Sequence, residues 1–287
     1  QTAMKQAERA DCEPTLTDTD VVEFCKQGFL MLEGVVPDEI NQRVLDFVDA
    51  NGHIPIRGED WFVEHVLLNR EAAGAVRSLI GANFAVPIGV ANHRIKCPMP
   101  AQEWHQDGGS RVGPAVNNLQ VFYYPQDAPP ELGPTEVLPG SHHLASHQRW
   151  MQHYGSVRGT VHTAAPAGSI FITAYPIWHR RSKSTAQGMR NMLKYCYWRM
   201  EPPRRDWIVD PDFDFAMAPY TLDGTIRHWS QFRDWYEAAE MFFWLCGDPG
   251  KMTEAVGGTG WPIGHPPPRM GEQIYPPVGF RRFPEHG

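Results

Sequence analysis

The segment from about residue 85 to residue 200 constrains the fold most, because it consists of short β-like runs with no helix-length segment between them. These runs are rich in Val, Ile, Tyr, Phe and Thr, and Gly, Pro, Asn and Asp separate them. Parallel strands need long crossovers, so this pattern favours an antiparallel sandwich or barrel over a parallel α/β sheet. The expected strands are Val86–Cys97, Asn118–Tyr124, Thr135–Leu138, Gly159–Ala164, Ser169–Tyr175 and Met192–Met200.

The first third of the chain is predicted to be rich in helix. Thr17-Asp18-Thr19-Asp20 places a side-chain acceptor three residues before an acid, which is typical of a capped helix start, and Gly28 would end this helix after Gln27. A strand over Phe29–Val35 follows. Two further helices are expected from Asp38 to about Ala50, closed by Asn51-Gly52, and from Arg70 to Ile80, closed by Gly81.

The β pattern fades after Pro202-Pro203. An acidic loop over 206–214 precedes a predicted helix from about Ser230 to Cys246, whose aromatic residues lie near one stripe. Packing against the sheet, a substrate lid and a homodimer face are three alternatives for this stripe. The Pro- and Gly-rich segment 257–287 is expected to be an extended arm. We therefore expect one domain over 1–287, with a helical flank (15–84), a β core (85–200) and a C-terminal helix and arm (201–287).

Charge and composition indicate a small molecule as the partner. The net charge is −7, the pI is about 6.0 and no run of five basic residues occurs, which argues against a nucleic-acid or anionic-membrane surface. Residues 1–10 contain no apolar core, so neither a signal peptide nor a membrane span is expected. The five cysteines are widely spaced without a C-x-x-C motif, which fits a reducing environment and predicts a cytoplasmic location.

Three side chains are candidate metal ligands. His105 and Asp107 form an H-x-D pair, and on an extended strand residues two apart point to the same face. The pair alone is a weak signal. His179, which follows the predicted strand over Ser169–Tyr175, supplies a third group, and two histidines with one carboxylate form the facial triad of non-haem Fe(II) oxygenases. His162 is the rival for the third position, whereas His142 and His143 are expected to be structural.

Arg190 is the candidate anchor for a 2-oxo acid. It lies eleven residues beyond His179, just ahead of a predicted strand. A guanidinium fork binds a carboxylate in a planar, two-point manner that the point charge of lysine cannot match. Arg180 and Arg181 remain alternatives. The triad with this arginine on one β scaffold is far more specific than the H-x-D pair by itself.

The chain from about Thr15 to Arg199 resembles the phytanoyl-CoA dioxygenase-like (PhyH-type) 2-oxoglutarate-dependent oxygenases. The similarity rests on the N-terminal segment 20–34, on Met99-Pro100-Ala101-Gln102 with Glu103 and Trp104 before the H-x-D pair, and on Thr135-Glu136-Val137 followed by Pro139-Gly140-Ser141-His142. The P-G-S-H turn between the H-x-D pair and the distal histidine is a recurring signature. These motifs look most like members that tailor natural products.

The resemblance implies a mainly β fold with flanking helices, namely a double-stranded β-helix or jelly roll. His105, Asp107 and His179 would ligate Fe(II), and Arg190 would hold the distal carboxylate of 2-oxoglutarate. Gln102 and Thr135 match positions that contact this co-substrate, and Asn92 is a weaker candidate. The segment after His179 lacks the small residues often found there, and no family motif extends beyond Pro202.

The implied reaction is oxidation of a small, apolar metabolite with O₂ and 2-oxoglutarate, which releases succinate and CO₂. Asp107 stands where a small residue would open a halide position, which favours hydroxylation over halogenation. Desaturation, epimerisation and ring rearrangement are variants that substrate positioning selects. Two alternatives to this function are a cupin-like metalloenzyme that uses no 2-oxo acid and a catalytically silent binding jelly roll.

Overall fold

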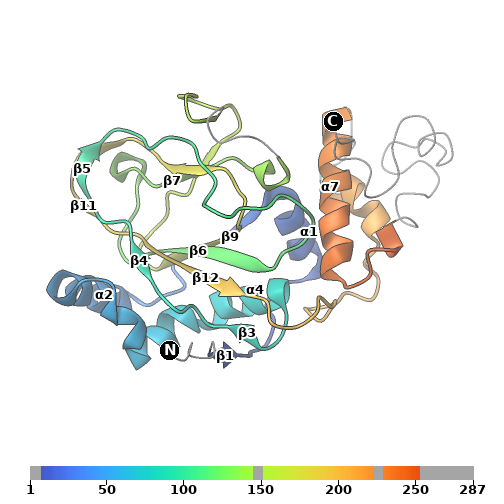
Figure 1. The fold of residues 1–287 in the computed structure, drawn as a ribbon, viewed down its shortest axis with the longest axis horizontal. Coiled ribbons are helices and arrows are strands. Elements are labelled where there is room, and N and C mark those ends of the chain that lie inside the picture. Colours follow the sequence, from blue (N-terminus) through green and yellow to red (C-terminus); the bar gives the residue numbers. More distant parts are fainter. Residues whose placement is uncertain (1–7, 145–150, 223–228, 253–287) are drawn as a thin grey trace, which may run out of the picture.

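The larger of the two β layers has central strands that are buried on both faces. In the computed structural model, which describes residues 8–144, 151–222 and 229–252, its order is β1-β3-β12-β6-β9-β2, with β4 also paired to β12 (Figure 1). All of its pairings are antiparallel. Its strands are β1 (Arg9–Ala10), β2 (Phe29–Leu32), β3 (Phe84–Ala85), β4 (Ala91–Asn92), β6 (Asn118–Tyr124), β9 (Ser169–Ala174) and β12 (Leu193–Trp198).

Side chains of the central strands alternate between two environments. Val121 and Tyr123 of β6 belong to the main hydrophobic cluster with the helices, whereas Phe122 belongs to a second cluster inside the β body. Because successive residues point to opposite faces, Gln120 on β6 shares the inner face with Phe122. Lys194 of β12 is paired with Phe122 and lies on that face too. The inner face of an otherwise apolar sheet therefore carries polar groups at two neighbouring positions.

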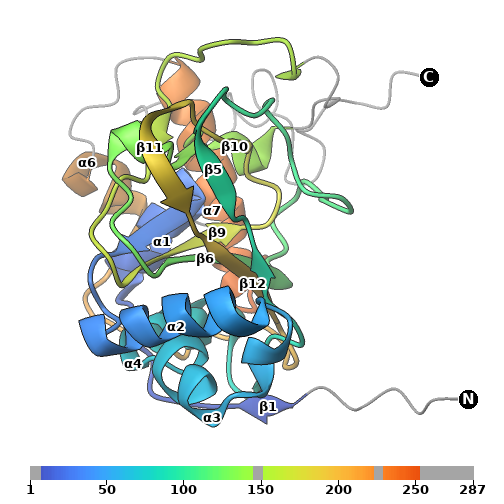
Figure 2. The ribbon, with the colours of Figure 1, turned by 90° about the vertical axis from the view of Figure 1, so that its left-hand side faces the viewer.

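The second layer consists of five strands in two small sheets that lie across from the larger sheet (Figure 2). β7 (Thr135–Val137) lies between β10 (His179–Arg181) and β8 (Val161–His162), and β5 (Ile95–Met99) pairs with β11 (Ser184–Arg190). The register of β11 against β5 shifts between Ser184 and Gly188, which marks a bulge. These strands are more polar than those of the larger sheet, and three of them carry predicted site residues, namely β7 (Thr135), β10 (His179) and β11 (Arg190).

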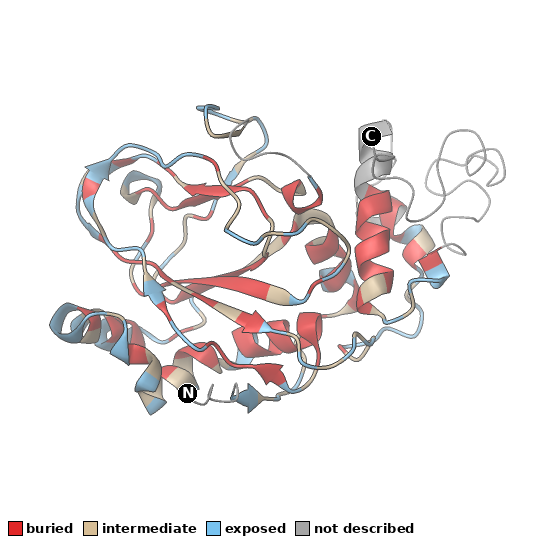
Figure 3. Cartoon of the chain, in the orientation of Figure 1, coloured by how far each residue is buried: buried red, intermediate tan, exposed pale blue. Residues whose placement is uncertain are grey.

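Helices cover the outer face of the larger sheet (Figures 2 and 3). They are α2 (Asp38–Asn51), α3 (Asp60–Phe62), a π-helical segment (Val63–Leu67) and α4 (Arg70–Ile80), and α4 is buried from Ala72 onward. Short 3₁₀ helices occupy Pro55–Gly58, Pro130–Leu132, Ser141–His143 and Phe215–Met217. Among the described helices, none combines the length and the apolar character that a membrane crossing requires.

Helix α7 (Trp229–Leu245) packs along α1 (Asp18–Gln27), with α6 (Ala218–Leu222) nearby. We predicted that the aromatic stripe of this helix packs against the sheet. That prediction was wrong, because the helix packs chiefly against another helix, α1. The described members of the stripe, including Trp235 and Phe242, are buried within this chain. A buried stripe offers no dimer surface, so the homodimer remains a prediction without this support.

Most predicted elements of the N-terminal flank and the hydrophobic strands are confirmed. Helix α1 has its capping box at Thr17 and ends at Gly28, whose φ of 81° is the left-handed conformation that glycine tolerates. The prediction of one strand over Val86–Cys97 was wrong, because Pro87 and Gly89 interrupt it: β3 ends at Ala85, and only β4 and the first part of β5 fall within the predicted range. The predicted mainly β fold with flanking helices is confirmed. The predicted arm over 257–287 lies outside the described residues, and the division into one domain stays a prediction.

Asp18 links the start of α1 to the segment that leads to α7. Its carboxylate is fully buried and accepts hydrogen bonds from Arg205 at 2.8 and 2.7 Å, from Trp207 at 2.8 Å and from the Asp210 backbone at 2.7 Å. Burial alone would raise the pKa of Asp18, but these bonds outweigh burial and lower it below its ordinary value. The charged form is therefore the one that the fold requires.

We expect Asp18→Asn to lower the free energy of unfolding by about 3 kcal/mol, because it leaves the buried part of Arg205 without its counter-charge. The folded pKa is depressed, so the contribution is complete above the unfolded pKa of about 4 and is lost as the pH falls below it. Urea unfolding at pH 7 and at acid pH measures this difference. Asp46→Asn, at an exposed position on α2, is the control; a difference of equal size at both pH values would contradict the assignment.

Candidate active site

His105 and His179 meet through a pair of backbone hydrogen bonds. The His105 N–H donates to the His179 carbonyl at 3.1 Å, and the His179 N–H donates to the His105 carbonyl at 3.0 Å. Residues that exchange both bonds in this way project their side chains on the same face of an antiparallel pair. The two imidazole rings consequently lie side by side, with centroids 4.4 Å apart. The segment around His105 is a loop with an isolated bridge, so the prediction that the H-x-D pair lies on a strand was wrong.

Both imidazole rings are oriented by a backbone carbonyl two residues earlier. His105 Nδ1 lies 2.9 Å from the Glu103 carbonyl, and His179 Nδ1 lies 3.0 Å from the Ile177 carbonyl. A carbonyl can only accept, so Nδ1 carries the proton in each ring and Nε2 keeps its lone pair. This is the tautomer that a metal ligand requires, with the second nitrogen fixing the ring.

The carboxylate of Asp107 completes the cluster. Its Oδ1 lies 3.9 Å from Nε2 of His105 and 3.9 Å from Nε2 of His179, and one ligand atom from each residue falls within 4.8 Å of the others. Its Oδ2 accepts hydrogen bonds from Gln120 Nε2 and Lys194 Nζ. One oxygen is thus held by the protein while the other faces the two histidines, an arrangement suited to a single-point ligand.

The protonation states of the cluster favour cation binding. Burial lowers the pKa of His179 to about 3, and the charges of its neighbours add to this effect, so the ring is neutral at physiological pH. Burial would raise the pKa of Asp107, but the neighbouring His179, Lys194 and Gln120 outweigh burial and lower it. A deprotonated carboxylate and two neutral imidazoles are the forms that bind Fe(II). Within the described part of the chain, no other group of three such ligands converges.

A cavity of about 270 Å³ adjoins the two histidines and is rich in positive charge. Arg190 lines it from the end of β11 and is 2% exposed. Its Nη1 donates to the His93 carbonyl at 3.3 Å and its Nη2 to Thr135 Oγ1 at 3.5 Å, while its Nε has no partner among the described residues. A buried guanidinium with long hydrogen bonds and no described carboxylate partner is arranged to receive an anion.

The two alternative arginines differ in their surroundings. Arg180 already has protein partners: its Nε donates to Glu136 at 2.7 Å, and its guanidinium lies 4.6 Å from the centroid of the Trp104 ring. Arg181 lines the same cavity as Arg190, and both burial and the charge of Arg190 lower its pKa. The lining of the cavity therefore contains three arginines, of which Arg180 is paired with Glu136, and no acidic residue.

Two of the three residues predicted to contact the co-substrate line the cavity, and the third does not. Thr135 is 2% exposed and Gln102 accepts from the Arg181 backbone at 3.4 Å, and both line the cavity with Arg190. Asn92 does not line it, because its side chain joins β4 to Asn191 at 3.1 Å. Gln102 and Thr135 are thus located where their predicted role requires, whereas Asn92 is structural.

The remaining histidines that entered the prediction lie elsewhere. The Nε2 atoms of His142 and His143 lie 3.0 and 2.9 Å from the Cys25 carbonyl, which places both in the packing under α1. His162 is half-exposed and lies 3.9 Å from Glu136. None of the three belongs to the converging ligand group.

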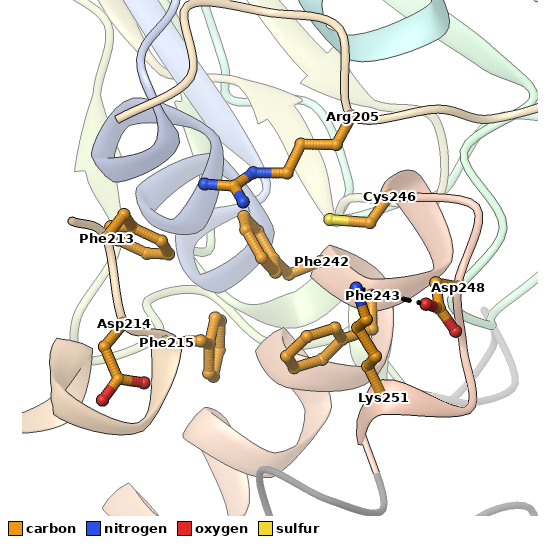
Figure 4. Close-up of a pocket in the computed structure, with 9 residues that line it drawn as sticks. All are labelled: Arg205, Phe213, Asp214, Phe215, Phe242, Phe243, Cys246, Asp248 and Lys251. Carbon is orange, nitrogen blue, oxygen red and sulfur yellow. Dashed lines mark ion pairs between the residues drawn. The ribbon is translucent and has the colours of Figure 1, made fainter. Parts of the chain in front are cut away.

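A separate cavity of about 420 Å³ lies between α7 and the segment before α6 (Figure 4). Its charged groups already have partners, since Arg205 binds Asp18, Asp248 lies 3.4 Å from Lys251, and Asp214 accepts from the Ala216 backbone. Cys246 and four phenylalanines line the rest: Phe213, Phe215, Phe242 and Phe243. It lacks a converging ligand set, so the chemistry is assigned to the histidine cluster.

Sequence reasoning missed Gln120 and Lys194, the two residues that hold Asp107. A signal was available, because each is a polar residue inside a strand that is otherwise apolar, NLQVFYY and LKYCYW. A polar side chain at such a position must have a partner on the inner face of the sheet.

Comparison with known proteins identifies relatives over the central part of the chain. The sequence profile of the family described as phytanoyl-CoA dioxygenase (PhyH) matches residues 47–192, just over half of the chain, and includes every predicted site residue. No curated protein matches the sequence.

Solved structures share the fold at low identity. HygX from Streptomyces hygroscopicus with iron bound is 14% identical, with a TM-score of 0.54 over 65% of this chain and 88% of HygX. The carbocyclase SnoK from nogalamycin biosynthesis is 16% identical, with a TM-score of 0.52 over 65% of this chain and 87% of SnoK. The epimerase SnoN from the same pathway is 14% identical, with a TM-score of 0.51 over 62% and 81%. The likeness confirms the predicted jelly roll.

We expect Gln120→Leu to weaken Fe(II) binding about 10- to 100-fold, because Asp107 Oδ2 loses a hydrogen bond that orients the carboxylate. Anaerobic titration with Fe(II) measures the affinity, and circular dichroism confirms that the variant is folded. Gln187→Leu, at an exposed position on β11, is the matched control. Equal affinities for the two variants would show that Gln120 does not orient the ligand.

Proposed function

The chain belongs to the phytanoyl-CoA dioxygenase (PhyH) family of Fe(II)- and 2-oxoglutarate-dependent oxygenases, and we propose that it hydroxylates an unactivated C–H bond of a small, largely apolar metabolite. In this proposal His105, Asp107 and His179 ligate the iron. Arg190 binds the distal carboxylate of 2-oxoglutarate, with Gln102 and Thr135 beside it.

The observation that carries the proposal is the buried Arg190 guanidinium beside the His–Asp–His cluster. A charge that is 2% exposed and lacks a described acidic partner is costly unless a ligand neutralises it. The dicarboxylate 2-oxoglutarate supplies both what Arg190 lacks and a chelating group for a metal with open positions. A cupin-like metalloenzyme without a 2-oxo acid would leave Arg190 unexplained.

The donor set suits Fe(II). Two neutral imidazoles and a carboxylate held at one oxygen leave positions for the co-substrate and for O₂. Bound iron and 2-oxoglutarate together supply the oxidising chemistry, with succinate and CO₂ as by-products. The residues of the chain contribute orientation, because the carbonyls of Glu103 and Ile177 fix the rings and Lys194 with Gln120 fixes the carboxylate.

The choice of hydroxylation rests on the ligand set. Asp107 keeps the carboxylate ligand whose absence would admit a halide. The carbocyclase SnoK and the epimerase SnoN share this fold, so substrate positioning decides the outcome within one scaffold. Product mass under isotopically labelled O₂ distinguishes hydroxylation, which adds one labelled oxygen, from desaturation or epimerisation, which add none.

We expect the Fe(II)-loaded protein to develop a visible metal-to-ligand charge-transfer band on anaerobic titration with 2-oxoglutarate. Such a band requires a chelated 2-oxo acid, so its saturation measures the co-substrate affinity without knowledge of the substrate. Iron binding without a band would favour the metalloenzyme that uses no 2-oxo acid. Failure to bind iron would favour a catalytically silent jelly roll.

We expect Arg190→Ala to weaken 2-oxoglutarate binding about 100-fold in this titration, while Fe(II) affinity changes little. The reason is the loss of a buried charge-assisted pair, which is worth about 2–5 kcal/mol when one partner is removed. Arg94→Ala, at an exposed arginine paired with Asp49, is the control and should retain the affinity of the parent protein. An unchanged affinity in Arg190→Ala would transfer the anchor to Arg181.

A further inference from the structure

A further cavity adjoins the candidate active site and has Asp107 in its lining. It measures about 630 Å³ and shares His93 and Lys194 with the smaller cavity that contains Arg190. Asp107, Gly108 and Tyr175 border it, and the Tyr175 hydroxyl donates to the Gly108 carbonyl at 3.0 Å. The candidate ligand Asp107 is thus reached from this cavity, which is large enough for a small metabolite.

The walls of this cavity are mainly apolar. Val90, Ala91 and Tyr195 form part of them, and Ile88 and Trp198 lie at their exposed edge. Ile88 is 83% exposed and Trp198 is 47% exposed. Large apolar side chains gathered at the edge of a cavity gain free energy when an apolar ligand covers them.

Lys194 is the polar group that distinguishes the cavity. Its ammonium group has three N–H donors, and Asp107 Oδ2 is its one hydrogen-bond partner among the described residues. Its side chain is 15% exposed, and its Nζ lies 5.4 Å from the centroid of the Phe122 ring. Donors therefore remain for a ligand group at the junction of the two cavities.

The charges around both cavities leave an excess of positive charge. Asp107 is the sole acid in the two linings, whereas Lys194, Arg181 and Arg190 are cations and Arg180 is paired with Glu136. The two charges of Fe(II) and the two of 2-oxoglutarate cancel, so their binding does not remove this excess. An anionic ligand is attracted to the site, and a cationic one is repelled.

We propose that the 630 Å³ cavity is the substrate site and that it selects an apolar molecule carrying a carboxylate, which Lys194 binds while the apolar body covers Trp198 and Ile88. This inference rests on the proposed function, since it assigns the substrate class of that same oxygenase site. It excludes polycationic substrates, because Asp107 offers the cavity its one negative charge.

The test uses three matched probes with one ring system: 2-naphthylacetate, 2-naphthylacetamide and 2-(2-naphthyl)ethylamine. Calorimetric titration of each into the anaerobic Fe(II)–2-oxoglutarate protein measures affinity without turnover. We expect the carboxylate to bind at least about tenfold more tightly than the amide, because a charge-assisted bond replaces a neutral one. The amine should bind most weakly.

Lys194→Met separates recognition from orientation of Asp107. If Lys194 binds the carboxylate, the ratio of carboxylate to amide affinity falls to about one in this variant. A residue that only orients Asp107 would lower iron affinity and leave the ratio unchanged, which would overturn the proposal. Lys96→Met, at an exposed position on β5, is the control and should keep the ratio of the parent protein.

Trp198→Glu provides a test that leaves the metal cluster intact. An added acid at the edge of the cavity should weaken carboxylate binding about tenfold. Met200→Glu places the same charge two residues further along, at a position that does not line the cavity, and should have little effect. Equal effects of the two variants would place the carboxylate elsewhere.

The outcomes separate this inference from the proposed function. Absence of the charge-transfer band with 2-oxoglutarate alone would overturn the function. A normal band with equal or tighter binding of the amide or the amine, or with no binding of the three probes, would leave the function intact and overturn the substrate class.

Discussion

The two backbone hydrogen bonds between His105 and His179 are the interaction on which the site depends. They bring together residues that are 74 positions apart and set both imidazoles on one face. The loop beside them is held by Trp104, which is fully buried and lies under the Arg180 guanidinium. The relative position of the two histidines therefore depends on two backbone hydrogen bonds next to one buried tryptophan, Trp104.

Around this pairing, the polar groups are arranged by the alternation of side chains along β6 and β12. Outward residues such as Val121 and Tyr123 pack with the helices and stabilise the fold. Inward residues Gln120 and Lys194 reach Asp107 and determine which of its oxygens is free. The same two strands thus serve stability on one face and chemistry on the other, so substitutions at neighbouring positions should have different consequences.

The sequence predicts the hydrophobic half of this architecture well and the polar half poorly. Helices α1, α2 and α4 and strands β6 and β9 follow from capping residues and apolar runs, because local burial determines them. Strands β10 and β11 were not predicted. Their sequences, HRR and STAQGMR, lack apolar alternation, because the buried positions of β10 are His179 and Arg180 and because β11 is largely exposed between its two buried ends. The position of Arg190 at the end of β11 is therefore a finding of the structure, whereas its place just ahead of β12 agrees with the predicted strand over Met192–Met200.

The pairing of His105 with His179 could not be deduced from local sequence, since a loop residue and a strand residue meet through a long-range register. The motif indicated which residue types converge, and the fold determined how. That distinction explains why the ligand types were predictable while the supports of the carboxylate were not. The lysine inside LKYCYW has no evident partner in the sequence, and the fold supplies Asp107 as that partner. Polar residues that violate the pattern of a buried strand are thus the sequence positions where a site of this kind should be sought first.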